Sequence, residues 1–183
     1  MRDFIRKEPL FALCGLKCGL CVMHLGGYCP GCGGGEGNQS CAIARCSMQH
    51  GKIQYCFACD AYPCASYAGT DAYDSFIPSR DRQKDFDRAQ QMGLDAFLNE
   101  LHAKMDILQE LLGHYNDGRR KTFFATAVYR LDFADLQAVM EALQAPQVQE
   151  LAVKERAQTA VWRLQEVAEK RKIDLKLRKK PKA

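Results

Sequence analysis

The chain of 183 residues lacks the short motifs that mark many enzyme classes. It contains no G-x-S-x-G, no P-loop, no H-E-x-x-H and no G-x-G-x-x-G sequence. It also has no internal repeat and no apolar stretch long enough to cross a membrane. The sequence therefore gives no motif-based reason to expect an enzyme, and we expect no membrane partner.

The beginning of the chain has no apolar run of signal-peptide length. Glu8, Pro9, Lys17 and His24 interrupt the apolar residues that are there. We therefore expect a cytoplasmic protein, in which thiols stay reduced.

Cysteine is confined to one part of the chain. All ten cysteines lie between Cys14 and Cys64, and three of the gaps between them hold two residues each. This spacing lets two thiolates bind one ion. Four thiolates satisfy the tetrahedral preference of Zn²⁺ and supply on the order of 10 kcal/mol of folding free energy to a small segment. The sequence predicts two zinc sites with two thiols to spare, drawn from Cys14, Cys18, Cys21, Cys29, Cys32, Cys41, Cys46, Cys56, Cys59 and Cys64.

Other uses of these cysteines stay open. An even number of cysteines would suit a disulfide framework, but only in an oxidising compartment. The C-x3-C-x2-C order of Cys14, Cys18 and Cys21 matches that of radical-SAM enzymes, which bind an iron–sulfur cluster. Their barrel needs about 200 residues of alternating strands and helices, and the residues after 79 are predicted to be helical instead. His24 or His50 lies close enough in the sequence to replace one thiolate.

The composition changes along the chain. Glycine and cysteine dominate up to about residue 66, whereas alanine, leucine, glutamine, lysine and glutamate dominate from Ser79 onward. We therefore expect a cysteine-rich zinc-binding module over residues 1–67, a linker over 68–78, and a helical region with a basic C-terminal tail over 79–183. The predicted fold class is mostly α, with a small irregular zinc module packed on an antiparallel helical bundle.

Apolar spacing and capping residues predict the helices. Ser79 is the expected N-cap of a helix over 80–92, and Gly93 the residue that ends it. Pro63 can open a short helix with Cys64 in its first turn. Pro146 is expected to open one long helix, on which Trp162 would pack against the zinc module. Residues 173–178 alternate in polarity, as a short strand or an extended tail would. The remaining predicted helices cover 42–49, 94–115, 121–131 and 133–143.

The order of the cysteines carries a family resemblance. Cys14-Gly-Leu-x-Cys18-x-x-Cys21, Cys29-Pro-Gly-Cys32, Cys41-x-Ile-x-x-Cys46, Cys56-x-x-Cys59 and Tyr-Pro-Cys64 resemble the DUF3795 family of zinc-binding domains of unknown function. The resemblance covers about the first 65 residues. It implies a metal-binding fold and brings no reaction with it.

The overall charge is uninformative once the metal is considered. Two Zn²⁺ ions and eight thiolates would bring the formal net charge from +4 to about zero. The charge is unevenly distributed, since residues 171–183 hold seven basic side chains and one acidic side chain. This end can bind phosphates, although a solvated basic tail is the commoner explanation.

A second basic group lies at the predicted start of a helix, where cations oppose the helix dipole. We hypothesise that Asn116, Arg119, Arg120 and Lys121 form a small anion site that offsets this repulsion. The alternative is that Asp117 pairs with Arg120 or Lys121.

All-cysteine zinc sites are closed and structural, so enzyme activity is the less favoured hypothesis. We expect structural zinc that supports an interaction module for a protein or nucleic-acid partner. A redox-responsive zinc protein, in which a surplus thiol such as Cys14 or Cys64 reacts, is the second hypothesis. An iron–sulfur enzyme using the Cys14, Cys18 and Cys21 triad is the third.

Overall fold

The computed structural model describes residue 1 and residues 3–181. The last two residues of the predicted helical region, 182 and 183, lie outside this range. The described residues are mostly helical and contain no strand, only an isolated bridge between Ile5 and Gly34. The predicted mostly-α fold class is confirmed.

The helices divide into short pieces in the cysteine segment and longer ones after it. Three 3-10 turns, η1 (Cys18–Leu20), η2 (Cys56–Ala58) and η3 (Ala65–Tyr67), accompany the α-helices. The α-helices are α1 (Val22–Leu25), α2 (Ala42–Gln49), α3 (Arg82–Met92), α4 (Leu94–His114), α5 (Lys121–Arg130), α6 (Phe133–Leu143), α7 (Pro146–Gln149) and α8 (Val153–Arg171). None of the helices in the described part of the chain combines the length and the hydrophobicity needed to cross a lipid bilayer.

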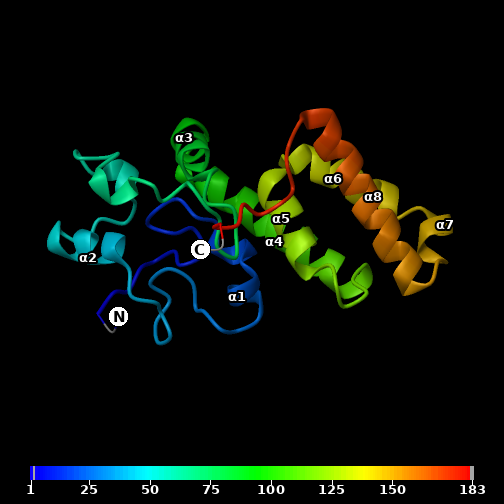
Figure 1. The fold of residues 1–183 in the computed structure, drawn as a ribbon, viewed down its shortest axis with the longest axis horizontal. Helices are drawn as coiled ribbons and strands as arrows, with labels where there is room; N and C mark the ends of the chain where they lie inside the picture. The colour runs from blue at the N-terminus through cyan, green and yellow to red at the C-terminus, as the bar shows by residue number, and fades with distance from the viewer. Residues whose placement is uncertain (2, 182–183) are drawn as a thin grey trace.

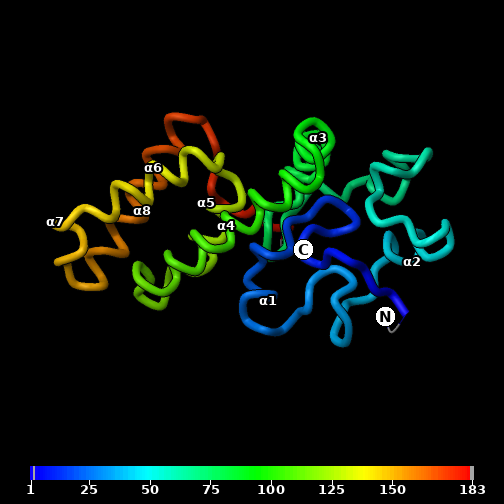
Figure 2. The backbone as a smooth tube through the Cα atoms, turned by 180° about the vertical axis from the view of Figure 1, so that it is seen from behind, coloured from blue at the N-terminus to red at the C-terminus, as the bar shows by residue number. Residues whose placement is uncertain are grey.

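The molecule is elongated, with the cysteine segment at one end and helices α6 to α8 at the other (Figure 1). Helices α3 and α4 lie between these ends, and α4 contacts both η1 and α5. The C-terminal segment leaves α8 and returns to the middle of the molecule, as the view from behind also shows (Figure 2). The last described residues therefore lie beside the junction of the two regions.

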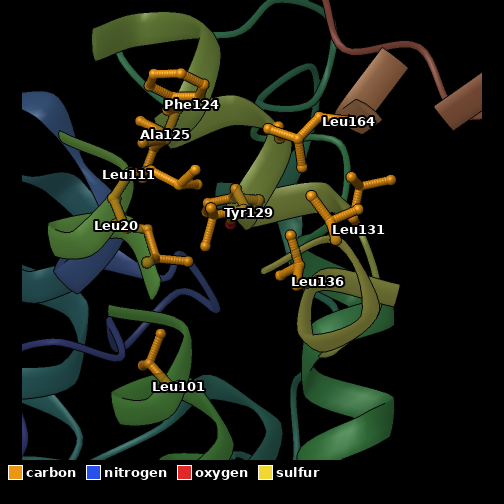
Figure 3. Packing of buried hydrophobic residues seen from close by; sticks show 14 of the residues in the cluster. Leu20, Leu101, Leu111, Phe124, Ala125, Tyr129, Leu131, Leu136 and Leu164 are labelled. Carbon is orange, nitrogen blue, oxygen red and sulfur yellow. The ribbon is translucent and has the colours of Figure 1, made fainter. Parts of the chain in front are cut away.

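One hydrophobic core runs through the helical region and into the cysteine segment. Figure 3 shows Leu20 of η1 near Leu101 and Leu111 of α4, with side chains of α5, α6 and α8 beyond them. These side chains are almost completely buried. Burial of one such leucine stabilises the fold by roughly 1.5–3 kcal/mol. The cysteine segment is thus joined to the helices by shared apolar packing.

The rest of the cysteine segment has little apolar packing of its own. Its separate cluster of buried apolar residues consists of Phe4, Leu13 and Ala44. The buried Arg6 side chain instead connects three parts of the segment through backbone carbonyls. Its guanidinium donates to the carbonyl oxygens of Phe11 at 2.9 Å, Gln54 at 2.7 Å and Cys32 at 3.3 Å.

A buried ion pair also joins the two regions. The Lys17 ammonium lies 2.8 Å from an Asp85 carboxylate oxygen of α3 and donates to the Tyr129 carbonyl of α5 at 2.9 Å. Both side chains of the pair are at most 5% exposed. Breaking such a pair leaves an uncompensated buried charge, so this contact constrains how the cysteine segment sits on the helices.

Glycine permits a close approach at the same junction. Gly19, in the middle of η1, lies so close to α4 that an added Cβ would collide with Met105. The η1 turn therefore packs directly against the Met105 side chain of α4.

The helix boundaries mostly follow the prediction, with two exceptions. Helix α3 begins at Arg82 with Asp81 as its N-cap, so the predicted capping role of Ser79 is wrong. The Ser79 hydroxyl donates to the Tyr73 carbonyl at 2.7 Å, and its backbone N–H donates to Asp74 at 2.9 Å. Ser79 thus closes the preceding loop instead of starting the helix. Gly93 ends α3 as predicted, with a φ of 87°.

The predicted long helix after Pro146 is two helices. Helix α7 ends at Gln149, and α8 begins at Val153. The Gln149 side chain donates to the Tyr115 hydroxyl at 2.6 Å and to the Leu143 carbonyl at 2.7 Å, which holds α7 against the preceding helices. Trp162 on α8 is 53% exposed, so the prediction that it packs against the cysteine segment is wrong.

Residues 173–181 form an extended tail and no strand. Ile173 and Leu175 pack against the main core. The Arg178 backbone N–H donates to the Asp74 carboxylate at 2.8 Å, and the Asp74 N–H donates to the Arg178 carbonyl at 2.8 Å. The basic tail is therefore anchored as far as Arg178, and only the exposed Lys179 and Lys180 follow it before Pro181.

Candidate metal centre

Four cysteines from three parts of the chain line one small cavity. Cys46 comes from α2, Cys56 and Cys59 flank the η2 turn, and Cys64 precedes η3. The cavity has a volume of about 30 Å³, which is the space of one water molecule in liquid water. We call it the thiol cavity; its other lining residues are Leu13, Ile43, Ser47, His50, Ile53, Tyr62, Ser66 and Tyr67.

Two of the C-x2-C sequences adopt the same backbone turn. The Cys21 N–H donates to the Cys18 carbonyl at 3.0 Å, and the Cys59 N–H donates to the Cys56 carbonyl at 3.0 Å. Each turn closes a backbone loop between its two cysteines, and the binding of one ion by a pair stays a prediction. The third pair, Cys29 and Cys32, is held differently, because the Cys32 N–H donates to the Pro9 carbonyl at 2.8 Å.

Cys64 lies just outside the helical turn that follows it. The η3 turn begins at Ala65 with Cys64 as its N-cap, so the prediction that Pro63 opens a helix with Cys64 in its first turn is wrong. The Tyr62 N–H donates to the Cys59 carbonyl at 2.9 Å, so the turn at η2 continues through Tyr62. The next turn therefore begins only at Ala65. Cys64 is thereby placed on the thiol cavity opposite α2.

Burial favours the protonated thiol in this cavity. Burial, against the opposing effect of the Tyr67 hydroxyl and together with the neighbouring Cys14, Cys64 and Cys46, raises the pKa of Cys56 to about 11. A bound cation would reverse this preference, because coordination favours the thiolate. The site is therefore one in which metal binding would release protons.

The Tyr67 hydroxyl is an unpartnered polar atom in the wall of the thiol cavity. The atom is buried and makes no hydrogen bond of acceptable length and angle. Burial raises the pKa of Tyr67, and the adjacent Cys56 raises it further. A buried hydroxyl normally has a partner, and a Cys56 thiolate would supply a strong acceptor. Donors to ligating atoms are common around metal sites.

His50 lies at the edge of the same cavity. Its Nδ1 is 3.5 Å from the Cys46 sulfur and 2.8 Å from the Cys46 carbonyl oxygen. It is exposed, and the predicted option that a histidine replaces a thiolate stays a prediction. His24 lies apart from this cavity, with its Nδ1 3.0 Å from the Cys29 carbonyl oxygen.

The remaining cysteines form a second group at the junction with the helices. Burial raises the pKa of Cys18, and four neighbouring thiols raise it further: Cys32, Cys14, Cys21 and Cys29. Burial and nearby Cys32, opposed by the Arg82 guanidinium, raise the pKa of Cys14 to about 11. Cys41, immediately before α2, is exposed.

Across residues 1 and 3–181, no group of three or more Cys, His, Asp or Glu side chains is arranged so that it could hold a metal ion. The four cysteines that line the thiol cavity are nevertheless the residue type that structural zinc sites use, although their side chains are not gathered around one point.

The predicted anion site is engaged in bonds within its own loop. The Asn116 side-chain oxygen accepts from the N–H groups of Gly118 and Arg120, both at 3.1 Å. Asp117 accepts from the Arg119 N–H at 3.1 Å and lies 3.4 Å from the Arg120 guanidinium. The predicted alternative, in which Asp117 pairs with Arg120, is present, and the geometry favours it over an anion at this loop. Lys121 is the first residue of α5.

Sequence reasoning missed two residues that shape the cysteine groups. Arg82 lies beside Cys14 and is held by Asp71 at 2.7 Å. Tyr67 lies beside Cys56. Tyr67 lies only three residues after Cys64, so its position in the sequence signals that it is close to the cysteines. Nothing in the sequence connects Arg82 with Cys14.

No protein family model matches the chain, and no curated protein or solved structure is detectably similar to it. The DUF3795 resemblance therefore stays a prediction.

Proposed function

We propose that this protein binds two structural zinc ions and that they stabilise the cysteine segment as an interaction module. The observation that carries the proposal is that Cys46, Cys56, Cys59 and Cys64 all line one small cavity. These residues come from or flank α2, η2 and η3, three elements that follow one another between residues 42 and 67, and a common ligand would hold them around the cavity.

The second ion is assigned to Cys18, Cys21, Cys29 and Cys32. These residues form two C-x2-C pairs. Cys14 raises the pKa of Cys18 as the other three do, so the spacing of the pairs, and not the pKa, separates Cys14 from this set. The assignment leaves Cys14 and Cys41 without a metal, which agrees with the two spare thiols that ten cysteines imply. Both sets consist of four thiolates, which close the coordination shell and leave no open position for catalysis.

An interaction module needs a rigid surface, and zinc provides that rigidity where apolar packing is scarce. The cluster of Phe4, Leu13 and Ala44 is too small to stabilise the segment alone. A zinc site contributes on the order of 10 kcal/mol of folding free energy. The partner is a protein or a nucleic acid, and the exposed Arg119, Lys179 and Lys180 are the residues available to an anionic one.

The test is the metal content of anaerobically purified protein, with an absorption spectrum. About two zinc ions per chain without visible absorbance support the proposal. Cys59→Ser should lower the zinc content to about one ion, because it removes one ligand set. Cys41→Ser is the matched control and should retain both ions. Iron with absorbance near roughly 400 nm would overturn the zinc assignment in favour of a cluster.

A mild oxidant separates the structural role from a redox-responsive one. A structural site keeps its zinc while exposed thiols such as Cys41 are oxidised. Release of zinc in proportion to thiol loss would instead identify a redox-responsive protein. Oligonucleotide binding that Arg119→Gln together with Lys179→Gln and Lys180→Gln weakens would identify a nucleic-acid partner.

A further inference from the structure

A second, larger hollow lies between the cysteine turns and the loop that precedes α3. Its volume is about 690 Å³, within the range of small-molecule sites. Three aromatic side chains on its rim are unusually exposed: Tyr28 by 73%, Phe76 by 52% and Tyr73 by 43%. We call it the aromatic hollow; its other lining residues are Leu16, Cys18, Cys21, Met23, Cys29, Gln39, Thr70, Ser75, Ile77, Ser79 and Arg82.

The exposed rings are costly for a protein to leave in water, because each presents a large apolar face. Single exposed apolar residues need no explanation, but three around one hollow are a feature of binding surfaces. They come from two loops that are far apart in the sequence, since Tyr28 lies in the cysteine segment and the other two follow it by more than forty residues. The fold therefore brings these three aromatic residues to one hollow.

The charge of the lining selects the kind of ligand. Arg82 is the one charged residue among those that line the hollow. Its guanidinium is held by the Asp71 carboxylate at 2.7 Å and donates to the Ser79 carbonyl at 3.1 Å. An anion would therefore meet no uncompensated positive charge in the lining, whereas aromatic rings attract a cation.

We propose that the aromatic hollow binds a small organic cation that carries a methylated ammonium group. Such a group is weakly hydrated and fits between aromatic rings, which surround it in the known modes of quaternary ammonium recognition. Cys18, Cys21 and Cys29 line the same hollow. If zinc occupies that cysteine set, which rests on the proposed function, the four thiolates leave a net charge of about −2 that strengthens the attraction.

The experiment compares choline with its neutral carbon isostere, in which a tert-butyl group replaces the trimethylammonium group. Both are titrated into the full-length protein by isothermal calorimetry or by ¹H–¹⁵N NMR. We expect saturable choline binding at least about fivefold tighter than that of the isostere, from a cation–π contribution of about 1 kcal/mol or more. Equal affinities would show a merely apolar hollow, and no saturation by choline would also overturn the proposal.

Matched variants locate the site. Phe76→Ala and Tyr28→Ala should weaken choline binding several-fold, and Phe76→Leu should do so while keeping apolar bulk. Trp162→Ala removes an aromatic ring that is 53% exposed on α8, away from the hollow, and should leave binding unchanged. Weakening by Trp162→Ala to the same extent would contradict the assignment. Circular dichroism of each variant confirms that it folds.

The zinc content of the same samples separates the two proposals. Zinc with no choline binding disproves the cation site alone. Choline binding that Phe76→Leu weakens, in protein without zinc, supports the rings as the binding element and disproves the proposed function alone.

Discussion

The cysteine segment and the helical region are stabilised in different ways. The helical region buries Leu108, Phe124, Leu136 and Leu164 completely, and its helices are 10–21 residues long apart from α7. The cysteine segment has helical pieces of three to eight residues. It contributes Phe11, Leu20 and Tyr55 to the core that it shares with the helices, and its own apolar cluster is small. The helical region is stabilised by burial, whereas the cysteine segment depends on backbone hydrogen bonds, its contact with α4 and, in our proposal, bound metal.

The largest effect should come from removing the metal. A high-affinity zinc chelator should unfold residues 14–64 while leaving α4 to α8 folded, because only the cysteine segment lacks a sufficient core. Hydrogen exchange followed by mass spectrometry should show lost protection in the segment and retained protection in the helices. Equal loss of protection in both regions would mean that they unfold as one unit.

A matched pair of core substitutions should sharpen the comparison. Leu108→Ala in α4 should lower the free energy of unfolding by about 2–5 kcal/mol, with or without chelator, because Leu108 is fully buried in the main core. Leu13→Ala removes a side chain that is 1% exposed in the small cluster. Its destabilisation should disappear when the metal is removed, because its surroundings are then unfolded. Urea titration measures both, and a persistent effect of Leu13→Ala would contradict this separation.

Lys104 gives a pH-dependent test of the helical side of the junction. Burial, with a smaller effect of the neighbouring Lys17, lowers the pKa of Lys104 from 10.5 to about 7. Between these two pH values the unfolded chain binds a proton that the folded protein does not, so stability rises with pH across that range. Lys104→Met removes this contribution. Its unfolding free energy relative to the natural sequence should fall by roughly 1 kcal/mol per pH unit between pH 7.5 and 9.5.

The loss of the Lys104 hydrogen bond to the Leu131 carbonyl, at 2.6 Å, adds a penalty that does not change with pH over this range. Only the change of this free-energy difference with pH tests the pKa of Lys104. Lys84→Met, at an exposed position nearby, serves as the control and should give a flat difference. A flat difference for Lys104→Met would show that its amine is charged in the folded protein.

The smallest effect should come from the anchor of the C-terminal tail. Burial alone would raise the pKa of Asp74, but donors from Arg178 and Ser79 outweigh it and lower the pKa from 3.8 to about 2. The carboxylate therefore stabilises the fold above pH 4, and this stabilisation is lost as the pH falls through 2. Asp74→Asn should destabilise the protein by about 2 kcal/mol at neutral pH, and the difference from the natural sequence should shrink toward pH 2.

Urea titrations at several pH values measure that difference. Asp87→Asn, an exposed carboxylate on α3, is the control and should have little effect. A difference that stays constant down to pH 2 would show that the Asp74 charge contributes nothing.

Local signals made most of the fold predictable. The spans of α2 and α6 agree with the prediction, and those of α4 and α5 differ at one end by a single residue, because capping residues and apolar spacing act over a few neighbours. The break after Gln149 was missed because it depends on hydrogen bonds to Tyr115 and Leu143, which lie elsewhere in the sequence. The exposure of Trp162 was missed because helical spacing does not reveal which face finds a partner.

The candidate site was only partly predictable. The spacing of Cys18 with Cys21 and of Cys56 with Cys59 indicated pairs, and the turns at η1 and η2 agree. Which pairs and single cysteines share a cavity is a tertiary question, and residue spacing does not encode the approach of Cys46 to Cys64. The aromatic hollow could not be predicted from the sequence either, because residues far apart in the chain form it.

The close contact between Gly19 and Met105 affects the order in which the parts of the protein fold. Residues 18–21 leave the ribosome before α4, but their turn docks on a helix that is synthesised some eighty residues later. Contacts between residues distant in sequence form late. We expect the cysteine segment to be synthesised first and completed last, so that its thiols stay accessible to oxidants and competing metals until α4 has emerged.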